Sequence, residues 1–189
     1  MRAAVLALHY QNDVVHPDGK LGAAAANPHL VENAARLLEG ARAAGVPVVS
    51  VRIAFPPEGV RVNAPIFEAA VRSGAVVEGS WGAEFHERLG PCEGEPVVTH
   101  ARVNGFHESD LESVLQALGA ERLVVAGVAT HSSVEHTARH ASDLGYEVVV
   151  AEDACASADP DLHAAALRVV RPHVARVATV SGVIEGLDG

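Results

Sequence analysis

The stretch GVATHSSVEH, residues 127–136, follows a run of apolar residues and opens a predicted helix. In an α/β protein, a turn of this kind delivers a side chain from the end of a buried strand into a cleft. The free N–H groups and the dipole at the start of a helix favour developing negative charge, which makes Ser133 a candidate nucleophile. Serine is also a common residue at helix N-termini, so a plain capping role is the alternative interpretation.

Outward from this turn, short apolar runs alternate with amphipathic segments along the chain. We predict strands over residues 3–8, 47–53, 96–100, 121–129, 146–153 and 175–180. We predict helices over residues 27–45, 64–72, 109–119, 133–145 and 159–170. Strands and helices that alternate in this way predict an α/β fold, a doubly wound six-stranded parallel sheet in three αβα layers.

Capping signals support several of these helices. Asn27 precedes Pro28, Ser109 stands three residues before Glu112 as in a capping box, and Asp159 precedes Pro160. Glycine- and proline-rich segments, residues 56–65 and 79–95, predict loops at the edge of the sheet where ligands bind.

Length and composition limit the function classes. The chain of 189 residues predicts one domain over residues 1–189, and its formal charge of −10 argues against binding nucleic acid or anionic lipid. Cys92 and Cys155 are too few for a disulfide framework and favour reduced thiols, hence a cytoplasmic protein. The apolar runs are too short to cross a membrane, and the opening residues lack a cleavage pattern.

Three predicted strands end in residues able to do chemistry, namely His9, His100 and the turn 129–133. The carboxyl ends of parallel strands meet at one edge of the sheet, so we expect these residues to share a cleft. A serine hydroxyl needs a base within hydrogen-bond reach, and either imidazole would serve. A zinc site built from His9, His100 and His131 is disfavoured because each comes from a different element, and we predict neither a metal nor a cofactor.

Four blocks of the sequence, spanning residues 3 to 158, resemble the isochorismatase-like (cysteine hydrolase) superfamily. They are VLALHYQNDVVHPDGKLG, GSWGAEFHERLGP, VVTHARVNGFHESDLESVLQALG and LVVAGVATHSSVEHTARHASDLGYEVVVAEDACAS. The resemblance implies a six-stranded parallel sheet and a catalytic trio of Asp, Lys and Cys. By position, this chain has His9 in place of the Asp, His100 in place of the Lys and Ser133 in place of the Cys.

The resemblance further implies an oxyanion hole made by the backbone N–H groups of Ala129 and Ser133, with a cis peptide between Val128 and Ala129. Backbone donors do not depend on side-chain identity, so this feature survives the three replacements. A serine needs proton removal concerted with attack, and an imidazole can act as the acid or the base. The substitutions are therefore chemically coherent with each other.

The resemblance also implies a small-molecule substrate and a homo-oligomer, a dimer or a tetramer. Three further side chains are candidates for contact with the substrate, namely Phe55, Trp81 and His131. Phe55 and Trp81 are equally compatible with the core. The segment after the second strand has no Asp-x-His pair, so a nicotinamidase-type metal site is not expected.

Three functional hypotheses stay open on the sequence. The first is hydrolysis of an amide, ester or enol ether with Ser133 as nucleophile and His9 or His100 as base. The second is a catalytically silent or non-hydrolytic member that binds a small molecule or a partner through the same cleft. The third is acid–base catalysis by the histidines without a covalent intermediate, which includes cleavage of the isochorismate type. A dicarboxylate substrate of that kind would need cationic partners, for which the candidates are Arg52, Arg61 and Arg102.

Overall fold

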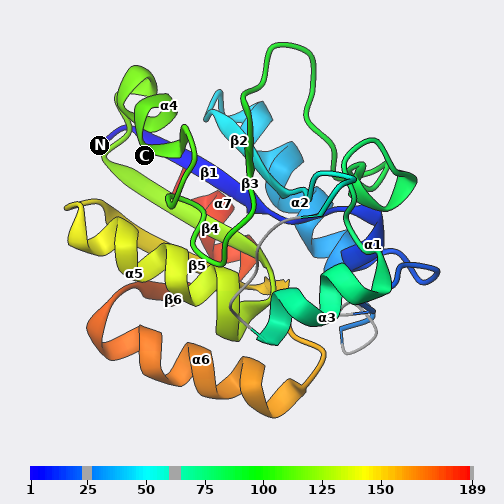
Figure 1. The fold of residues 1–189 in the computed structure, drawn as a ribbon. Coiled ribbons are helices and arrows are strands. Elements are labelled where there is room, and N and C mark those ends of the chain that lie inside the picture. Colours follow the sequence, from blue (N-terminus) through cyan, green and yellow to red (C-terminus); the bar gives the residue numbers. More distant parts are fainter. Residues whose placement is uncertain (23–26, 60–64, 188–189) are drawn as a thin grey trace.

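A computed structural model describes residues 1–22, 27–59 and 65–187 of the chain. Six parallel strands form one sheet in the order β3-β2-β1-β4-β5-β6 (Figure 1). The strands are β1 (Ala3–Leu8), β2 (Val48–Ile53), β3 (Val97–His100), β4 (Arg122–Val128), β5 (Glu147–Ala156) and β6 (Arg176–Ala178). The predicted doubly wound sheet is confirmed, because the order runs outward in both directions from the central pair β1 and β4.

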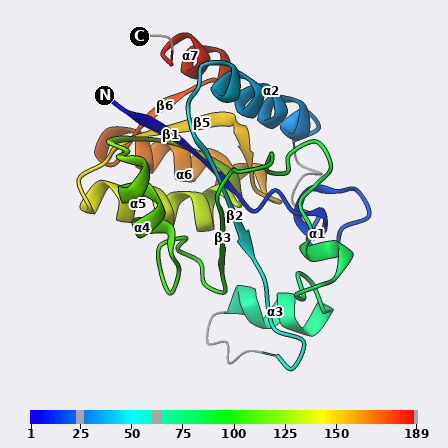
Figure 2. The same cartoon turned by 90° about the horizontal axis from the view of Figure 1, so that it is seen from above.

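Helices cover both faces of this sheet, as Figures 1 and 2 show from two directions. On one face lie α2 (Leu30–Ala43) and α7 (Val180–Glu185), and on the other lie α4 (Leu111–Leu118), α5 (Glu135–Asp143) and α6 (Pro160–His173). Two short helices, α1 (Asn12–Val15) and α3 (Pro65–Ser73), lie beyond the carboxyl ends of the strands. No helix in these residue ranges is both long and apolar enough to cross a bilayer.

The core follows from strands that are apolar on both faces. In β1, all residues from Ala4 to Leu8 are buried, because helices cover the sheet from both sides. The amphipathic α2 buries one face, composed of Leu30, Ala34, Ala35, Leu37, Leu38 and Ala41. The hydrophobic effect over these layers stabilises the fold and fixes where each strand ends.

The capping predictions hold in part. Asp159 caps α6 by accepting from the N–H groups of Asp161 and Leu162. Ser109 Oγ accepts from Leu111 N–H at 3.3 Å, but Glu112 accepts from the Gln116 amide instead of closing a capping box. Two helices were not predicted, α1 and α7, and residues 60–64 of the predicted 56–65 loop, including Arg61, lie outside the described residues.

Candidate functional site

Two histidines meet at the carboxyl edge of the sheet across the end of an intervening strand. His9 directly follows β1, His100 ends β3, and β2 lies between these strands. The Nε2 atoms of the two rings are 2.7 Å apart, and the rings stack with centroids 5.0 Å apart. His9 has a φ of 59°, a left-handed conformation that non-glycine residues adopt rarely and that recurs at functional sites. The structure thus brings together two of the three predicted catalytic side chains.

A kink in β4 supplies the second partner of His9. Gly127 has a φ of 146°, and a Cβ at this position would lie 2.2 Å from the carbonyl oxygen of Leu8. Only glycine allows β4 to pass so close to the end of β1. The carbonyl of the next residue, Val128, then lies 3.0 Å from His9 Nδ1.

These contacts fix the order of protons along the histidine pair. A carbonyl only accepts, so His9 Nδ1 must carry a hydrogen and donate it to Val128. The Nε2 atom of a neutral His9 is then an acceptor, and His100 Nε2 donates to it. His100 Nδ1 is left with a lone pair, and this buried atom has no hydrogen-bond partner among the described residues.

Both rings are neutral near pH 7. Burial, and to a lesser extent the neighbouring His100, lower the pKa of His9 to about 3, although the bond to Val128 opposes the shift. Burial also lowers the pKa of His100 to about 4. The backbone of Asn104 opposes that shift through a contact that falls short of hydrogen-bond geometry. At positions 9 and 100, where the resemblance implies an aspartate anion and a lysine cation, this chain therefore holds two uncharged imidazoles.

Ser133 lies in the turn that joins β4 to α5. The peptide between Val128 and Ala129 is cis, and residues Thr130–Val134 form one π-helical turn. The Ala129 carbonyl accepts from the N–H groups of Ser132 and Val134 and passes over that of Ser133, which lies between them. The Ser133 side chain is 8% exposed, and in the described part of the chain its hydroxyl has no hydrogen bond to either imidazole.

Ser133 and His9 line one cavity of about 250 Å³, together with Ala129 and His131. The rest of its described wall is mainly apolar, with Val14, Ile53, Ile66, Phe67, Ala70 and Val76 among its residues. His100 is not part of this lining. His9 therefore faces the cavity but has no free lone pair, whereas His100 has a free lone pair but does not line the cavity.

Two other residues of the turn anchor it to the elements that follow it in the chain. Thr130 Oγ1 lies 2.8 Å from His163 Nδ1, and His131 Nδ1 lies 2.8 Å from the hydroxyl of Ser157. These two contacts tie the turn to α6 and to the segment after β5. His131 keeps a place in the cavity wall while one of its nitrogens is engaged.

The predicted aromatic walls lie elsewhere. Phe55 is buried in the core, where its ring packs edge to face against Phe67, and Phe67 is the aromatic residue that lines the cavity. Trp81 is 49% exposed and contacts His16 rather than the cavity. Both positions fall in or beside loops, whose paths local sequence patterns do not determine.

The arginines considered as partners of a dicarboxylate do not line the cavity. Arg52 Nε donates to the hydroxyl of Thr99, and Arg102 forms an ion pair with Glu108 at 2.9 Å. Arg61 lies outside the described residues. In the described parts of the chain, no group of three or more His, Cys, Asp or Glu side chains has the arrangement of a metal site.

Sequence reasoning missed a second buried polar cluster at the end of β1, the clamp formed by Gln11, Asn12 and Asp13. Gln11 is fully buried, and its amide exchanges hydrogen bonds with both backbone groups of Ile53. Asp13 accepts from the backbone N–H groups of Val76 at 2.7 Å and Lys20 at 3.2 Å. The signal was the polar run QND directly after an apolar strand, which indicates polar residues that tertiary contacts must satisfy.

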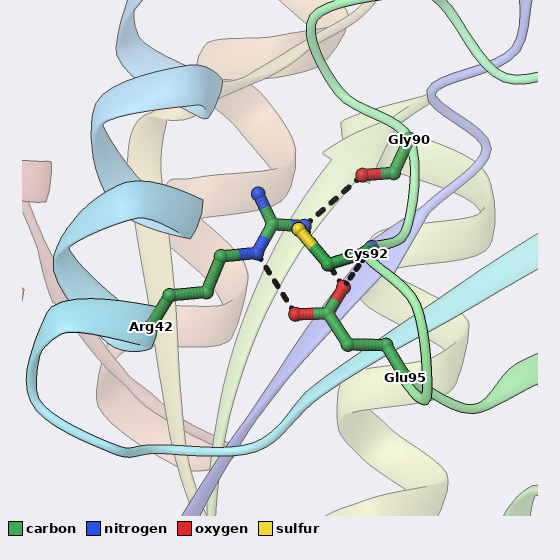
Figure 3. A network of polar contacts seen from close by, with 4 residues as sticks. All are labelled: Arg42, Gly90, Cys92 and Glu95. Carbon is green, nitrogen blue, oxygen red and sulfur yellow. Dashed lines mark hydrogen bonds and ion pairs between the residues drawn. The ribbon is translucent and has the colours of Figure 1, made fainter.

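Neither cysteine belongs to the cavity. Cys155 is fully buried, and burial raises the pKa of its thiol to about 12. Cys92 lies in the loop that leads to β3, where Figure 3 shows the Arg42 guanidinium bonded to the Glu95 carboxylate and the Gly90 carbonyl. Glu95 also accepts from Cys92 N–H. The network therefore fastens the loop before β3, the strand that ends in His100, to α2.

A parallel sheet of this order defines an α/β protein, with a candidate nucleophile in the turn after β4 and two histidines, one directly after β1 and one at the end of β3, at the same edge. The family model described as isochorismatase domain matches residues 3–182. The chain belongs to this family and therefore to the isochorismatase-like hydrolase superfamily.

Individual relatives agree with this assignment. The uncharacterized isochorismatase family protein YddQ of Bacillus subtilis is 33% identical over 97% of this chain and 93% of its own length. The ureidoacrylate amidohydrolase RutB of Azorhizobium caulinodans is 30% identical over 94% of this chain and 87% of its own. A crystal structure of a putative isochorismatase hydrolase from Oleispira antarctica superposes with a TM-score of 0.83 at 31% identity, covering 98% of this chain and 97% of that one.

Proposed function

We propose that this protein hydrolyses a small molecule at an amide, ester or enol ether bond, and that for an acyl substrate Ser133 is the nucleophile. The observation that carries the proposal is the shared cavity, whose wall holds Ser133, His9 and the turn that begins at Ala129. Its mainly apolar lining lowers the local dielectric and so strengthens electrostatic interactions with a developing charge.

The chemistry follows the order of bonds in an acyl transfer. The Ser133 oxygen forms a bond to the acyl carbon while the hydroxyl proton passes to an imidazole, and the N–H groups of Ala129 and Ser133 stabilise the oxyanion. Collapse of this intermediate breaks the bond to the leaving group, which takes the proton. Water then attacks the acyl-serine in the same way and releases the acid.

The resting proton order sets one condition on this mechanism. Both nitrogens of His9 are engaged, one by Val128 and one by His100. For His9 Nε2 to accept the serine proton, the His100 Nε2–H group must first turn away or lose its hydrogen. The proposal therefore makes His9 the base and His100 the group that must release it, so loss of the His9 ring should disable the site.

Covalent labelling tests the nucleophile directly. A fluorophosphonate probe should add its mass to the peptide that contains Ser133, and Ser133→Ala should abolish both labelling and turnover. Ser113→Ala is the control, because Ser113 lies on α4, outside the lining of the cavity, and its loss should leave both unchanged. Labelling that persists in Ser133→Ala would overturn the assignment. If turnover survives Ser133→Ala but not His9→Ala, the histidines act without a covalent intermediate.

A second candidate function is ligand binding without turnover. It is favoured by the missing contact between the Ser133 hydroxyl and either imidazole, and by the neutrality of both rings. A silent binder would gain thermal stability with a ligand. It would also leave amides, esters and enol ethers intact and show no labelling of Ser133.

A further inference from the structure

The cavity beside Ser133 adjoins a second hollow of different character. The second hollow is an open groove of about 350 Å³ lined by Val103, His131, Ser132, Glu135, His136 and Arg139. His131 and Ser132 belong to the lining of both spaces, so the two meet at the π turn. We call the first the acyl chamber and the second the polar groove.

The two spaces differ in the groups that they offer to a ligand. Every charged side chain among the lining residues just described belongs to the polar groove, which holds Glu135 and Arg139. Apart from His131, Ser132 and Ser133 of the turn, the acyl chamber offers mainly aliphatic side chains and Phe67, and His9 in its wall is neutral because burial lowers its pKa. An anionic group placed in the acyl chamber would lose its hydration without gaining a lysine or arginine partner among the described lining residues.

Arg139 lies one helical turn after Glu135. Its guanidinium donates twice to Glu135 Oε1, at 2.8 and 3.1 Å, and its side chain is 41% exposed. These two bonds fix the guanidinium in the groove and leave other N–H groups, of the five that arginine carries, for a ligand.

We infer that the substrate joins an uncharged, largely apolar acyl group to a polar leaving group, and that the two parts occupy the acyl chamber and the polar groove. The inference rests on the proposed function, since it names the substrate class of the same site. Ser133 belongs to the lining of the chamber but not to that of the groove, so the bond that it attacks lies where the two meet.

The orientation follows from the path that the products must take. The leaving group departs first, as a protonated amine or alcohol, and the open groove leads it to water past groups that hydrogen-bond to it. The acyl group stays attached to Ser133 in the apolar chamber until water attacks. The reverse orientation would bury the polar product among aliphatic side chains, at a cost in free energy.

Binding measurements with Ser133→Ala test the inference without turnover. The probes are four amides, in which a butanoyl or a succinyl group is joined to propylamine or to ethanolamine. We expect butanoyl ethanolamide to bind tightest by calorimetry, and both succinyl amides to bind at least about tenfold more weakly than their butanoyl partners. Equal or tighter binding of the succinyl amides, or no binding of either butanoyl amide, would overturn the acyl half of the inference.

Two further substitutions, each made in the Ser133→Ala protein, test the acyl chamber and the polar groove separately. Phe67→Ala should weaken both butanoyl amides about tenfold, whereas Phe106→Ala, an equally buried phenylalanine outside the chamber, should not. Arg139→Gln should weaken butanoyl ethanolamide but not butanoyl propylamide, and Arg171→Gln, on α6, should change neither. If Arg139→Gln weakens the binding of both butanoyl amides equally, the part of the inference that concerns the leaving group is overturned.

The labelling experiment keeps the two proposals apart. If the probe labels Ser133 but the four amides bind without preference, only the substrate class is wrong. If the preference holds but Ser133 is not labelled, the site binds this class of compound and the proposed hydrolysis fails.

Discussion

Two buried polar clusters follow β1 within five residues, and they satisfy their hydrogen bonds differently. The clamp of Gln11, Asn12 and Asp13 closes its bonds within the protein, because its amides and its carboxylate are paired with backbone groups. The histidine pair does not, since one nitrogen of His100 has no partner among the described residues. Buried polar groups in native proteins are nearly always paired, and His100 Nδ1 is one of four buried side-chain atoms without a hydrogen-bond partner in the described part of the chain. The proposed catalytic role of the pair would account for this one.

The same comparison separates stability from activity. The clamp holds one residue of the cavity wall, because Asp13 accepts from the backbone of Val76, and it ties down the next loop through the bond from Gln11 to the Ala83 carbonyl. The histidine pair stabilises the fold little more than an apolar pair of the same shape would. Substitutions in the clamp should therefore cost mainly folding free energy, and substitutions in the pair should cost mainly turnover.

The largest expected effect is on turnover. His9→Asn removes the proposed base while keeping a residue that tolerates its left-handed φ of 59°. It should lower kcat/KM about a thousandfold, or ~4 kcal/mol in activation free energy. His100→Leu removes the N–H group that occupies His9 Nε2, so it should lower kcat/KM much less, and the double variant should lose little more than His9→Asn alone. A loss in His100→Leu as large as that in His9→Asn would show that His100 takes part in the proton transfer itself.

The next effect concerns the free energy of unfolding. Asp13→Ala removes a buried carboxylate and leaves the Val76 N–H unpaired, so it should destabilise the fold by about 3 kcal/mol in urea denaturation. Asp18→Ala is the control, because that side chain is 87% exposed and its loss should cost less than about 0.5 kcal/mol. Equal effects of the two substitutions would remove the structural role assigned to the clamp.

A smaller loss of stability should follow from crowding the clamp. A Cβ added at Gly82 would lie 1.9 Å from Asp13 Oδ2, so Gly82→Ala must displace the carboxylate and should cost about 2 kcal/mol. At Gly90 the nearest atom to an added Cβ is 3.6 Å away, an ordinary contact, and Gly90→Ala should be nearly neutral. The difference between the two unfolding free energies measures how rigidly the clamp is held.

The sequence predicted the sheet because strands buried on both faces leave continuous apolar runs that are easy to recognise. Strand ends follow directly from such runs, which is why His9, His100 and the 129–133 turn could be placed at one edge. The short helix α1 could not be predicted. It holds four residues, too few to show periodicity, and tertiary contacts of its own polar residues fix it.

The chemistry inside the site was less accessible to sequence reasoning. The proton order of the histidine pair depends on the Val128 carbonyl, and a kink at Gly127 sets the position of that carbonyl. The cavity wall also depends on the paths of loops, which brought Phe67 into the lining and left Phe55 in the core. Both features arise from contacts between residues far apart in the chain, which local patterns do not record.

The smallest expected effect is the change in stability between pH 7 and 6.5 that the two histidines cause. Burial lowers the pKa of both histidines, to about 3 and about 4, so the unfolded chain takes up protons below pH 6.5 before the folded chain does. The resulting stability is present above pH 6.5 and is lost as pH falls toward 4. Between pH 7 and 6.5 the loss should be about 0.5 kcal/mol for the two rings together, and it should steepen below. The His9→Asn/His100→Leu variant should lack this component in parallel urea titrations, whereas Asp13→Ala should keep it. Identical pH profiles for the double variant and the parent protein would mean that the two rings titrate alike in the folded and unfolded chains, and that their neutrality is not a property of the site.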